Sequence, residues 1–337
     1  MWIKLNINEE NKKIFFNHTL ILLISCKKLY IIIVVILVFN ICSYIYKNKK
    51  ISICLCVIAK NENLYVREFV EHYKKLGYDN IFIYDNNDKD GEFFEEVIND
   101  YIQNGFVKII NFRQRNTNTK PIFDAYKDCY SKNNNSYNWL SFFDMDEFLE
   151  INQKYSKIQD FLKDKIFNNC QNIKLNWLLS INNHILYYEN KPLQQRIKNF
   201  NYNNSANKLI KSTVRGNLPV NYWYNMSNPH TSILNITSCS SSGKIIASDL
   251  THIFPPDFTN AKLKHYYYKS FEELCIKIKR GKCDLTKNIS DKIIIEKYKI
   301  LYEQSKNNPT KIKILNDVFG NSTTEFNIFK GSKNLSS

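Results

Sequence analysis

From residue 51 onward, short apolar runs alternate with segments whose apolar residues recur every three or four positions. The first pattern is typical of strands buried on both faces, and the second of amphipathic helices. Strands are expected at residues 51–59, 80–84, 106–110 and 139–143, and helices at residues 64–76, 93–102 and 122–130. This order predicts βαβ units, and therefore an α/β fold with a mostly parallel sheet and helices on both faces.

The second half of the chain is less regular. We expect a strand at residues 173–179, an Asn-rich loop at residues 199–207, and an amphipathic helix at residues 271–279 that Gly281 ends. Beyond residue 287 the chain is basic and polar, with a helical stretch near residues 291–302. The main domain is therefore predicted at residues 51–285, followed by a basic C-terminal tail at residues 286–337.

Residues 29–46 contain no charged residue, and Asn40 is their one strongly polar interruption. A helix of this length just spans a hydrocarbon core of about 30 Å. The β-branched run at residues 31–35 would also suit a buried strand, but the uninterrupted apolar length favours a transmembrane helix. A cleaved signal peptide would have a shorter apolar region nearer the terminus. We predict an N-terminal tail at residues 1–28 and a single anchor at residues 29–46.

Lysines flank both ends of this apolar segment, so the positive-inside rule does not determine its orientation.

The nine cysteines form no CxxC pair and no Cys/His cluster with zinc spacing. Cys54 and Cys56 share one face of a predicted strand, where we expect them to be buried as small hydrophobes. The odd total leaves room for one or two disulfides.

The 337-residue chain is 44% hydrophobic and 14% aromatic, with only 8 Gly and 7 Pro. These values exclude wholesale disorder, collagen-like repeats and a small disulfide scaffold. The net charge of +15 would suit a protein that binds phosphate backbones. However, Asn, Lys and Ile are all abundant, as an AT-rich coding sequence would produce, and we favour this explanation of the charge.

The clearest chemical signal is the acidic segment that follows the strand at residues 139–143. Asp144 and Asp146 lie two residues apart at the carboxyl end of that strand, where open parallel sheets bind ligands. Together they could hold Mg²⁺ or Mn²⁺ through oxygen ligands, and such an ion neutralises charge on a phosphate leaving group. The alternative is an acidic cap on a following helix, but the apolar residues on both sides of the pair favour the metal.

Polar residues also follow the first two strands. Lys60 and Glu62 come after the first strand, and Asp85 after the second. Each has a simpler explanation, because Asn61 could cap a helix and Asp85 could form a turn. Since the ends of all three strands meet at one edge of the sheet, we predict a cleft with a nucleotide lying across Lys60, Glu62, Asp85 and Asp144.

Residues 53–88 and the segment WLSFFDMDEF at residues 139–148 resemble the catalytic domain of glycosyltransferase family 92 and the related family 2-like transferases. Weaker matches follow at Arg196, at the pair Lys211-Ser212, at residues 228–230 and at residues 265–281. The resemblance implies a GT-A fold, a nucleotide-sugar donor (a uridine diphosphate sugar), a divalent metal and attachment to a membrane as a type II protein. It implies that Glu62 and Asp85 contact the nucleoside, and that Asp144 and Asp146 contact the ribose, the metal and the diphosphate.

His265 is a candidate third ligand of the metal or the phosphate, because GT-A enzymes often close the site with a downstream histidine. Beside three tyrosines it could instead be a core residue. His230 is a weaker candidate. Lys269 and Arg280 could neutralise a diphosphate, or could be solvated charges on a helix.

An inverting transfer needs a base for the proton of the acceptor hydroxyl. Glu189, Asp249 and His184 are available. The chain departs from the family where members have a Gly-rich stretch, here residues 180–184, and where Gln195 replaces an acid before Arg196. Both departures fall in the half expected to bind the acceptor.

We therefore predict a membrane-anchored glycosyltransferase of the ER or Golgi type, or of a host membrane, that acts on a glycan or glycoprotein acceptor and uses Mn²⁺ or Mg²⁺. No nucleic-acid partner is expected. The alternative is a membrane-tethered protein that binds polyanions without catalysis. Residues 264–269 (KHYYYK) are the best local case for it, because basic and aromatic residues alternate there. The acidic strand end argues against it, because carboxylates without a metal repel phosphate.

Overall fold

The computed structural model describes residues 34, 36–38, 51–113, 120–181, 185–219, 230, 236–281 and 287–320. The chain divides into two compact units, Met1–Lys50 and Ile51–Ser337. In the first unit, Val34 and residues 36–38 are helical and exposed. The predicted tail at residues 1–28 and the rest of the predicted anchor lie outside the described residues. Within the described ranges, no helix is both long enough and apolar enough to cross a bilayer, and the anchor stays a prediction.

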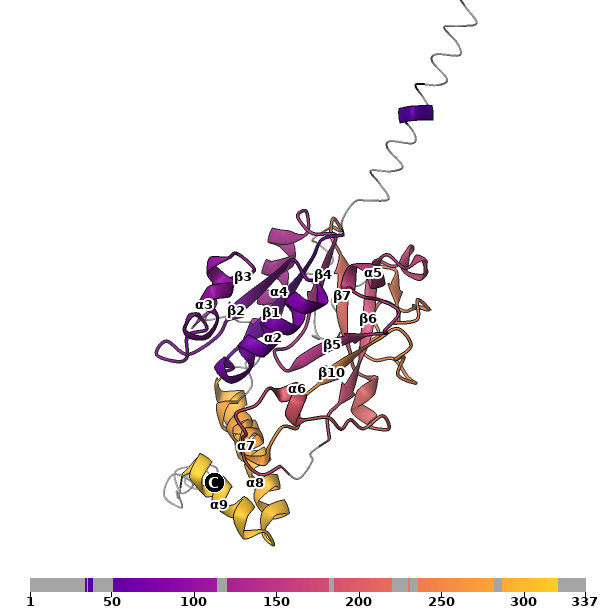
Figure 1. Cartoon of the computed structure of the whole chain (residues 1–337). Coiled ribbons are helices and arrows are strands. Elements are labelled where there is room, and N and C mark those ends of the chain that lie inside the picture. Colours follow the sequence, from indigo (N-terminus) through magenta and orange to yellow (C-terminus); the bar gives the residue numbers. More distant parts are fainter. Residues whose placement is uncertain are drawn as a thin grey trace, which may run out of the picture. The chain divides into compact units, whose positions relative to one another are not determined.

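The second unit is built on a mixed β-sheet with the strand order β3-β2-β1-β4-β7-β6-β10-β5, with β8 beside β6 and β9 beside β8 (Figure 1). The strands are β1 (Ile53–Ala59), β2 (Asn80–Asp85), β3 (Val107–Asn111), β4 (Trp139–Phe142), β5 (Glu147–Ile151), β6 (Asn172–Leu179), β7 (Ile210–Arg215), β8 (Ser238–Cys239), β9 (Ile245–Ile246) and β10 (Ala261–His265). Strands β1 to β4 pair in parallel, but β7 is antiparallel to both β4 and β6, and β5 is antiparallel to β10. The expected α/β fold is confirmed, and the sheet is parallel up to β4 and mixed beyond it.

The helices are α2 (Asn63–Leu76), α3 (Glu95–Gln103), α4 (Pro121–Asn133), α5 (Ile158–Leu162), α6 (Leu193–Arg196), α7 (Phe271–Arg280), α8 (Lys287–Ser305) and α9 (Pro309–Phe319), with 3₁₀ turns at Lys165–Phe167 and Ser205–Lys208. Helix α2 buries its apolar stripe and ends at Gly77, whose φ of 102° is left-handed. Glycine adopts this conformation without the steric cost that a Cβ would add, which explains why the helix stops there.

Strand β1 is buried on both faces. Its residues Leu55 and Val57 pack in the same core as the apolar stripe of α2, whereas Cys54 and Cys56 pack with residues of α4 on the other face. Burial raises the pKa of both thiols well above its usual value. The expectation that this pair is buried is therefore confirmed, and a continuous apolar run such as β1 is what such a central parallel strand requires.

Residues 287–320 form two helices that pack against α7. A separate apolar core joins Leu274 and Ile278 of α7 to Leu301 of α8 and to Ile314 of α9. In Figure 1 these three helices lie together, beyond one end of the sheet. The segment that we expected to be a basic tail is thus helical and part of the same compact unit as the sheet up to residue 320.

A disulfide joins Cys170, just before β6, to Cys239 in β8. The two cysteines are 69 positions apart in the sequence, and the bond between them fixes the short strand β8 beside β6. Four further cysteines in the described ranges, Cys54, Cys56, Cys129 and Cys275, are free and buried.

Candidate functional site

A cavity of about 290 Å³ opens at the carboxyl ends of β1 and β4. Its wall is made by the residues that follow β1, by the turn between β4 and β5, by β6, β7 and the end of β10, and by the helices α7 and α8. Asp144 and Asp146 lie in it together with Lys60 and Glu62. Four of the five residues that were expected at the strand ends therefore lie together at one edge of the sheet.

Asp144 lies against a buried lysine. The Lys211 ammonium donates to Asp144 Oδ1 at 2.6 Å, and only 1% of the Lys211 side chain is exposed. Burial opposes ionisation of Asp144, but the lysine outweighs it and holds the pKa of this carboxyl below its usual value. The neighbouring Glu147 side chain is fully buried, and its Oε2 accepts the Asp144 amide at 2.9 Å. Burial and the Asp144 charge raise the pKa of Glu147 well above its usual value.

Asp146 is held by two groups. Lys277 of α7 donates to its Oδ2 at 2.5 Å, and His265 Nε2 lies 3.5 Å from its Oδ1. Burial opposes ionisation of this carboxyl too, but Lys277 and His265 hold its pKa well below the usual value. Asp146 is therefore a buried anion and Asp144 a half-buried one, and each is neutralised by a lysine.

The residues after β1 are tied to the end of α7. Arg280 Nη1 donates to Glu62 Oε1 at 2.5 Å and to the Lys60 carbonyl at 2.7 Å. Glu62 Oε2 has no hydrogen-bond partner in the described part of the chain, although Lys269 Nζ lies 3.8 Å away. Lys60 reaches outward to Asp88 at 2.8 Å. The two cations that we considered for a diphosphate, Lys269 just before α7 and Arg280 at its end, thus both lie beside Glu62, and Arg280 lines the cavity.

Asp85 does not line the cavity. Its Oδ2 accepts from Arg113 Nε at 2.8 Å, and its Oδ1 accepts both the amide and the side chain of Asn87, at 3.0 and 2.7 Å. Asn87 in turn accepts the Asn61 amide at 2.7 Å. Because the chain's own donors occupy both carboxylate oxygens, the structure gives Asp85 the task of holding the loops after β1 and β2.

Three aromatic rings lie against one another, in tilted and edge-on contacts, along one wall of the cavity. The Trp177 ring lies 4.2 Å from the His265 ring and 5.0 Å from the His230 ring, between centroids. His230 Nδ1 is 2.9 Å from the Ile210 carbonyl, and burial lowers its pKa to about 4. The indole N–H of Trp177 is buried and has no hydrogen-bond partner among the described residues. The wall therefore offers a donor to an oxygen of a ligand.

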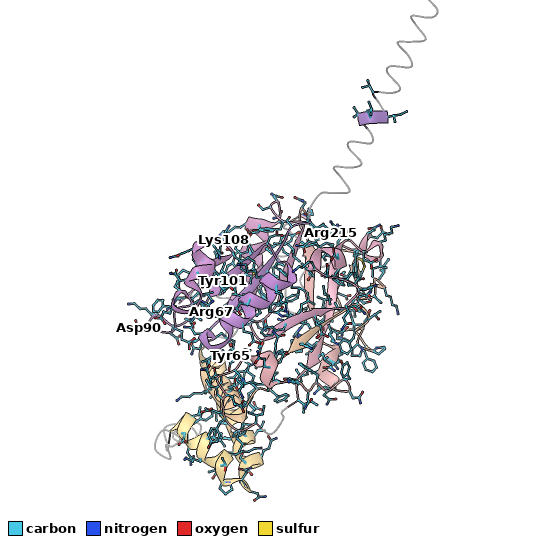
Figure 2. The ribbon with its side chains drawn as sticks, viewed as in Figure 1. Tyr65, Arg67, Asp90, Tyr101, Lys108 and Arg215 are labelled. Atoms are coloured by element: carbon cyan, nitrogen blue, oxygen red, sulfur yellow. A yellow bond between two sulfur atoms is a disulfide. The ribbon has the colours of Figure 1, made fainter. Side chains whose placement is uncertain are left out.

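A buried network holds α7 in place. Arg196 makes a two-pronged pair with Glu273, at 2.8 and 2.7 Å, and both side chains are 1% exposed. Tyr65, labelled in Figure 2, donates from α2 to Glu273 at 2.6 Å. Ser270 caps the helix by accepting the Glu273 amide. Since Lys277 and Arg280 lie on the next turns of α7, this network sets where both cations enter the cavity.

The sequence of residues 49–246 matches the family model for glycosyltransferase family 92. The chain belongs to glycosyltransferase family 92. This confirms the resemblance found in the strand-end motifs. A family 92 protein of Oryza sativa subsp. japonica is 27% identical over 119 residues, which is 35% of this chain and 19% of the relative. Another, of Ricinus communis, is 31% identical over 108 residues, 30% of this chain and 17% of the relative. The chain thus matches less than a fifth of the length of either curated relative.

Solved structures align with this chain at lower sequence identity than the curated relatives do. TarS of S. aureus, in complex with UDP, aligns with a TM-score of 0.33 and 13% identity over 77% of this chain and 74% of its own. The mannosyltransferase PcManGT from Pyrobaculum calidifontis, in complex with GDP-Man and Mn²⁺, aligns with a TM-score of 0.36 and 9% identity over 85% of this chain and 80% of its own. Alignments with such low scores do not bear on the ligand of the family 92 chain.

Two of the three proposed bases, Glu189 and Asp249, lie apart from the metal candidates. The Glu189 side chain is 53% exposed, pairs with Lys191 at 3.2 Å and does not line the cavity. Asp249 is exposed as well. His184 lies outside the described residues. The structure therefore brings the donor-side candidates other than Asp85 together, and leaves Glu189 and Asp249 apart from them.

The metal candidates are Asp144, Asp146 and His265. In the described part of the family 92 chain, no group of three His, Cys, Asp or Glu side chains is arranged to hold a metal ion. The three candidates do line one cavity, and carboxylate oxygens with an imidazole are donors that Mn²⁺ accepts. The donor chemistry therefore fits a divalent cation, although the lysines now occupy one oxygen of each carboxylate.

Several site residues had no role in the sequence analysis. Lys211 belongs to a motif of the resemblance, but its burial against Asp144 follows from the pairing of β7 with β4, which periodicity does not reveal. Lys277 lies three residues before Arg280, a spacing that puts both on one helix face and would have been the available signal. Trp177 and Lys297 of α8 gave no signal beyond their residue types.

Proposed function

We propose that this chain is a metal-dependent glycosyltransferase with a GT-A fold, which transfers a sugar from a nucleotide-sugar donor bound in the cavity. The observation that supports it best is the cavity itself: at the carboxyl ends of β1 and β4, it brings Asp144 and Asp146 together with Lys60, Lys277 and Arg280. Carboxylates for a cation and basic groups for phosphates are what a diphosphate donor requires. Membership of family 92 supports the same reaction class.

The chain's own residues would act as follows. Lys277 and Arg280 donate to phosphate oxygens and orient the diphosphate. Lys211, itself buried, keeps Asp144 ionised. Asp144, Asp146 and His265 would hold Mn²⁺ or Mg²⁺, which, when bound, supplies neutralising charge to the phosphate leaving group.

The donor is proposed to be a uridine diphosphate hexose and the acceptor a glycan or glycoprotein, with transfer by inversion. The acceptor hydroxyl must lose its proton to a base, and Glu189 and His184 remain the proposed candidates. Glu62 and Lys60 lie on the cavity wall where a nucleoside would extend beyond the diphosphate.

We also propose that residues 29–46 anchor the enzyme in a membrane of the ER or Golgi type, or of a host cell, as a type II-like single-pass protein. The disulfide Cys170–Cys239 supports this orientation. Disulfides persist in oxidising compartments such as the ER lumen and are rare in the cytosol, so the domain that carries it is expected on the lumenal or extracellular side.

The test is equilibrium binding of UDP and GDP to the full chain in detergent, by calorimetry, with and without Mn²⁺. A polyanion such as heparin is the comparison ligand. We expect UDP to bind in the micromolar range or tighter in the presence of Mn²⁺ and more weakly in excess chelator. Binding of heparin without binding of either nucleotide would contradict the proposal and favour the polyanion-binding alternative.

A further inference from the structure

The charges around the cavity do not balance. Three carboxylates line it, and each has a cation of its own in the wall: Arg280 for Glu62, Lys211 for Asp144 and Lys277 for Asp146. Two lining cations then remain, Lys60 and Lys297. Lys60 pairs with Asp88, which lies outside the cavity.

Lys297 has no such partner. Its ammonium donates to the hydroxyl of Tyr267 at 3.1 Å, and no carboxylate within the described ranges lies at ion-pair distance from it. Lys277 faces the same tyrosine, with its ammonium 4.2 Å from the ring centroid, while that of Lys297 lies at 5.8 Å. Two ammonium groups thus approach one neutral ring at the cavity wall. An anion placed beside Tyr267 would give Lys297 the counter-charge that Asp146 already gives Lys277.

The helix that carries Lys297 is fixed in position. Ile293, Ile294 and Lys297 of α8 line the cavity. On the side toward α7, Ile294, Tyr298 and Leu301 join the apolar core that α7, α8 and α9 share. The lysine is therefore presented by a packed helix, rather than by a solvated surface segment.

We propose that Lys297 binds a phosphate oxygen of the donor diphosphate, and that α8 is therefore part of the donor site. Helix α8 lies beyond residues 49–246, which match the family model, and beyond residues 265–281, the last segment of the resemblance. This inference rests on the proposed function, because it takes the ligand of the cavity to be a nucleoside diphosphate. A lysine ammonium is a suitable partner for phosphate, since it is a compact charge on a long stem.

The experiment compares UDP binding by the full chain and by Lys297→Met, with Lys299→Met as the matched control. Lys299 lies on the same helix and is exposed. A charge-assisted hydrogen bond to phosphate predicts that Lys297→Met weakens UDP binding by roughly tenfold to a hundredfold. The dependence of UDP affinity on salt should also become weaker in this variant, because one phosphate contact is gone. Lys299→Met should match the wild type in both measurements.

Lys297→Arg and thermal unfolding separate a phosphate contact from a packing role. Recovery of most of the UDP affinity in Lys297→Arg, with an unfolding temperature in Lys297→Met close to the wild type, supports the inference. Equal UDP affinity in Lys297→Met and wild type overturns it. So does a loss of affinity that Lys297→Arg does not restore and that accompanies a lower unfolding temperature. Failure of the wild type to bind UDP or GDP would instead overturn the proposed function and this inference with it.

Discussion

The Lys277 ammonium lies 2.5 Å from Asp146 Oδ2, although the two residues are 131 positions apart in the chain. The carboxylate that is proposed to hold a divalent cation is thus neutralised by a side chain from α7. When a cation and a diphosphate are both present, Lys277 can donate to a phosphate oxygen and Asp146 can coordinate the cation, so each charge keeps a partner. The pair links α7 to the strand-end motif.

The first prediction concerns Asp144 and Asp146. Replacing either by Asn keeps the side chain's shape but removes the charge that a cation needs, so we expect UDP-sugar turnover to fall by about a hundredfold or more. The measurement is UDP release from the donor, together with binding of Mn²⁺ followed by electron paramagnetic resonance. Asp88→Asn is the control, because this carboxylate is 74% exposed and does not line the cavity. Full turnover in Asp146→Asn, or in excess chelator, would show that no metal acts there.

The second prediction concerns Asp85, which the sequence analysis assigned to the nucleoside. Its two oxygens accept from Arg113 and Asn87, so Asp85→Ala leaves buried donors without partners. We expect the free energy of unfolding to fall by about 1–3 kcal/mol, with UDP affinity nearly unchanged. Urea unfolding and a UDP titration measure the two effects. A tenfold loss of UDP affinity at unchanged stability would instead support the predicted contact between Asp85 and the nucleoside.

Much of the first half of the fold follows from local pattern. The apolar runs predicted β1, β2, β3 and β4 within a few residues, and the helical stripes predicted α2, α3 and α4. The position of Asp144 and Asp146 beyond a strand end was enough to place them in the cavity, because parallel strands present their carboxyl ends at one edge.

The second half was less predictable for a physical reason. Pairing direction depends on partners distant in sequence, so nothing local showed that β7 runs antiparallel to β4 and thereby brings Lys211 under Asp144. The helical stretch near residues 291–302 was recognised, but its docking onto α7 is a tertiary contact between apolar faces. Consequently the aspartates of the site were found from the sequence and the lysines that neutralise them were not.

The third prediction concerns the N-terminal unit. Deleting residues 1–48 should leave a soluble chain that binds UDP as the full chain does. The physical reason is that Ile51–Ser337 is a compact unit by itself and its first strand begins at Ile53. Size-exclusion chromatography without detergent and a UDP titration check both parts. An aggregated product with no cooperative unfolding would show that the deleted segment contributes to the core.

The last prediction follows from the network that holds α7. Arg196, Tyr65 and Ser270 outweigh the effect of burial and lower the pKa of Glu273 to about 2. A carboxyl with a lower pKa in the folded state than in the unfolded chain stabilises the fold above its unfolded pKa. That stability is lost as the pH falls through the folded value. Glu273→Gln should therefore be less stable than the wild type at pH 7, by on the order of 3 kcal/mol.

This difference should shrink as the pH is lowered from about 5 to about 3, because in this range the carboxyl takes up a proton in the unfolded chain but not yet in the folded one. Urea unfolding of both proteins across this range measures it. Glu272→Gln is the matched control, because Glu272 is the next residue in the chain and does not pair with Arg196. Since Glu273 also sets where Lys277 and Arg280 enter the cavity, Glu273→Gln should weaken UDP binding at pH 7 as well. A stability difference that does not change with pH would show that the Glu273 charge is not what holds α7 in place.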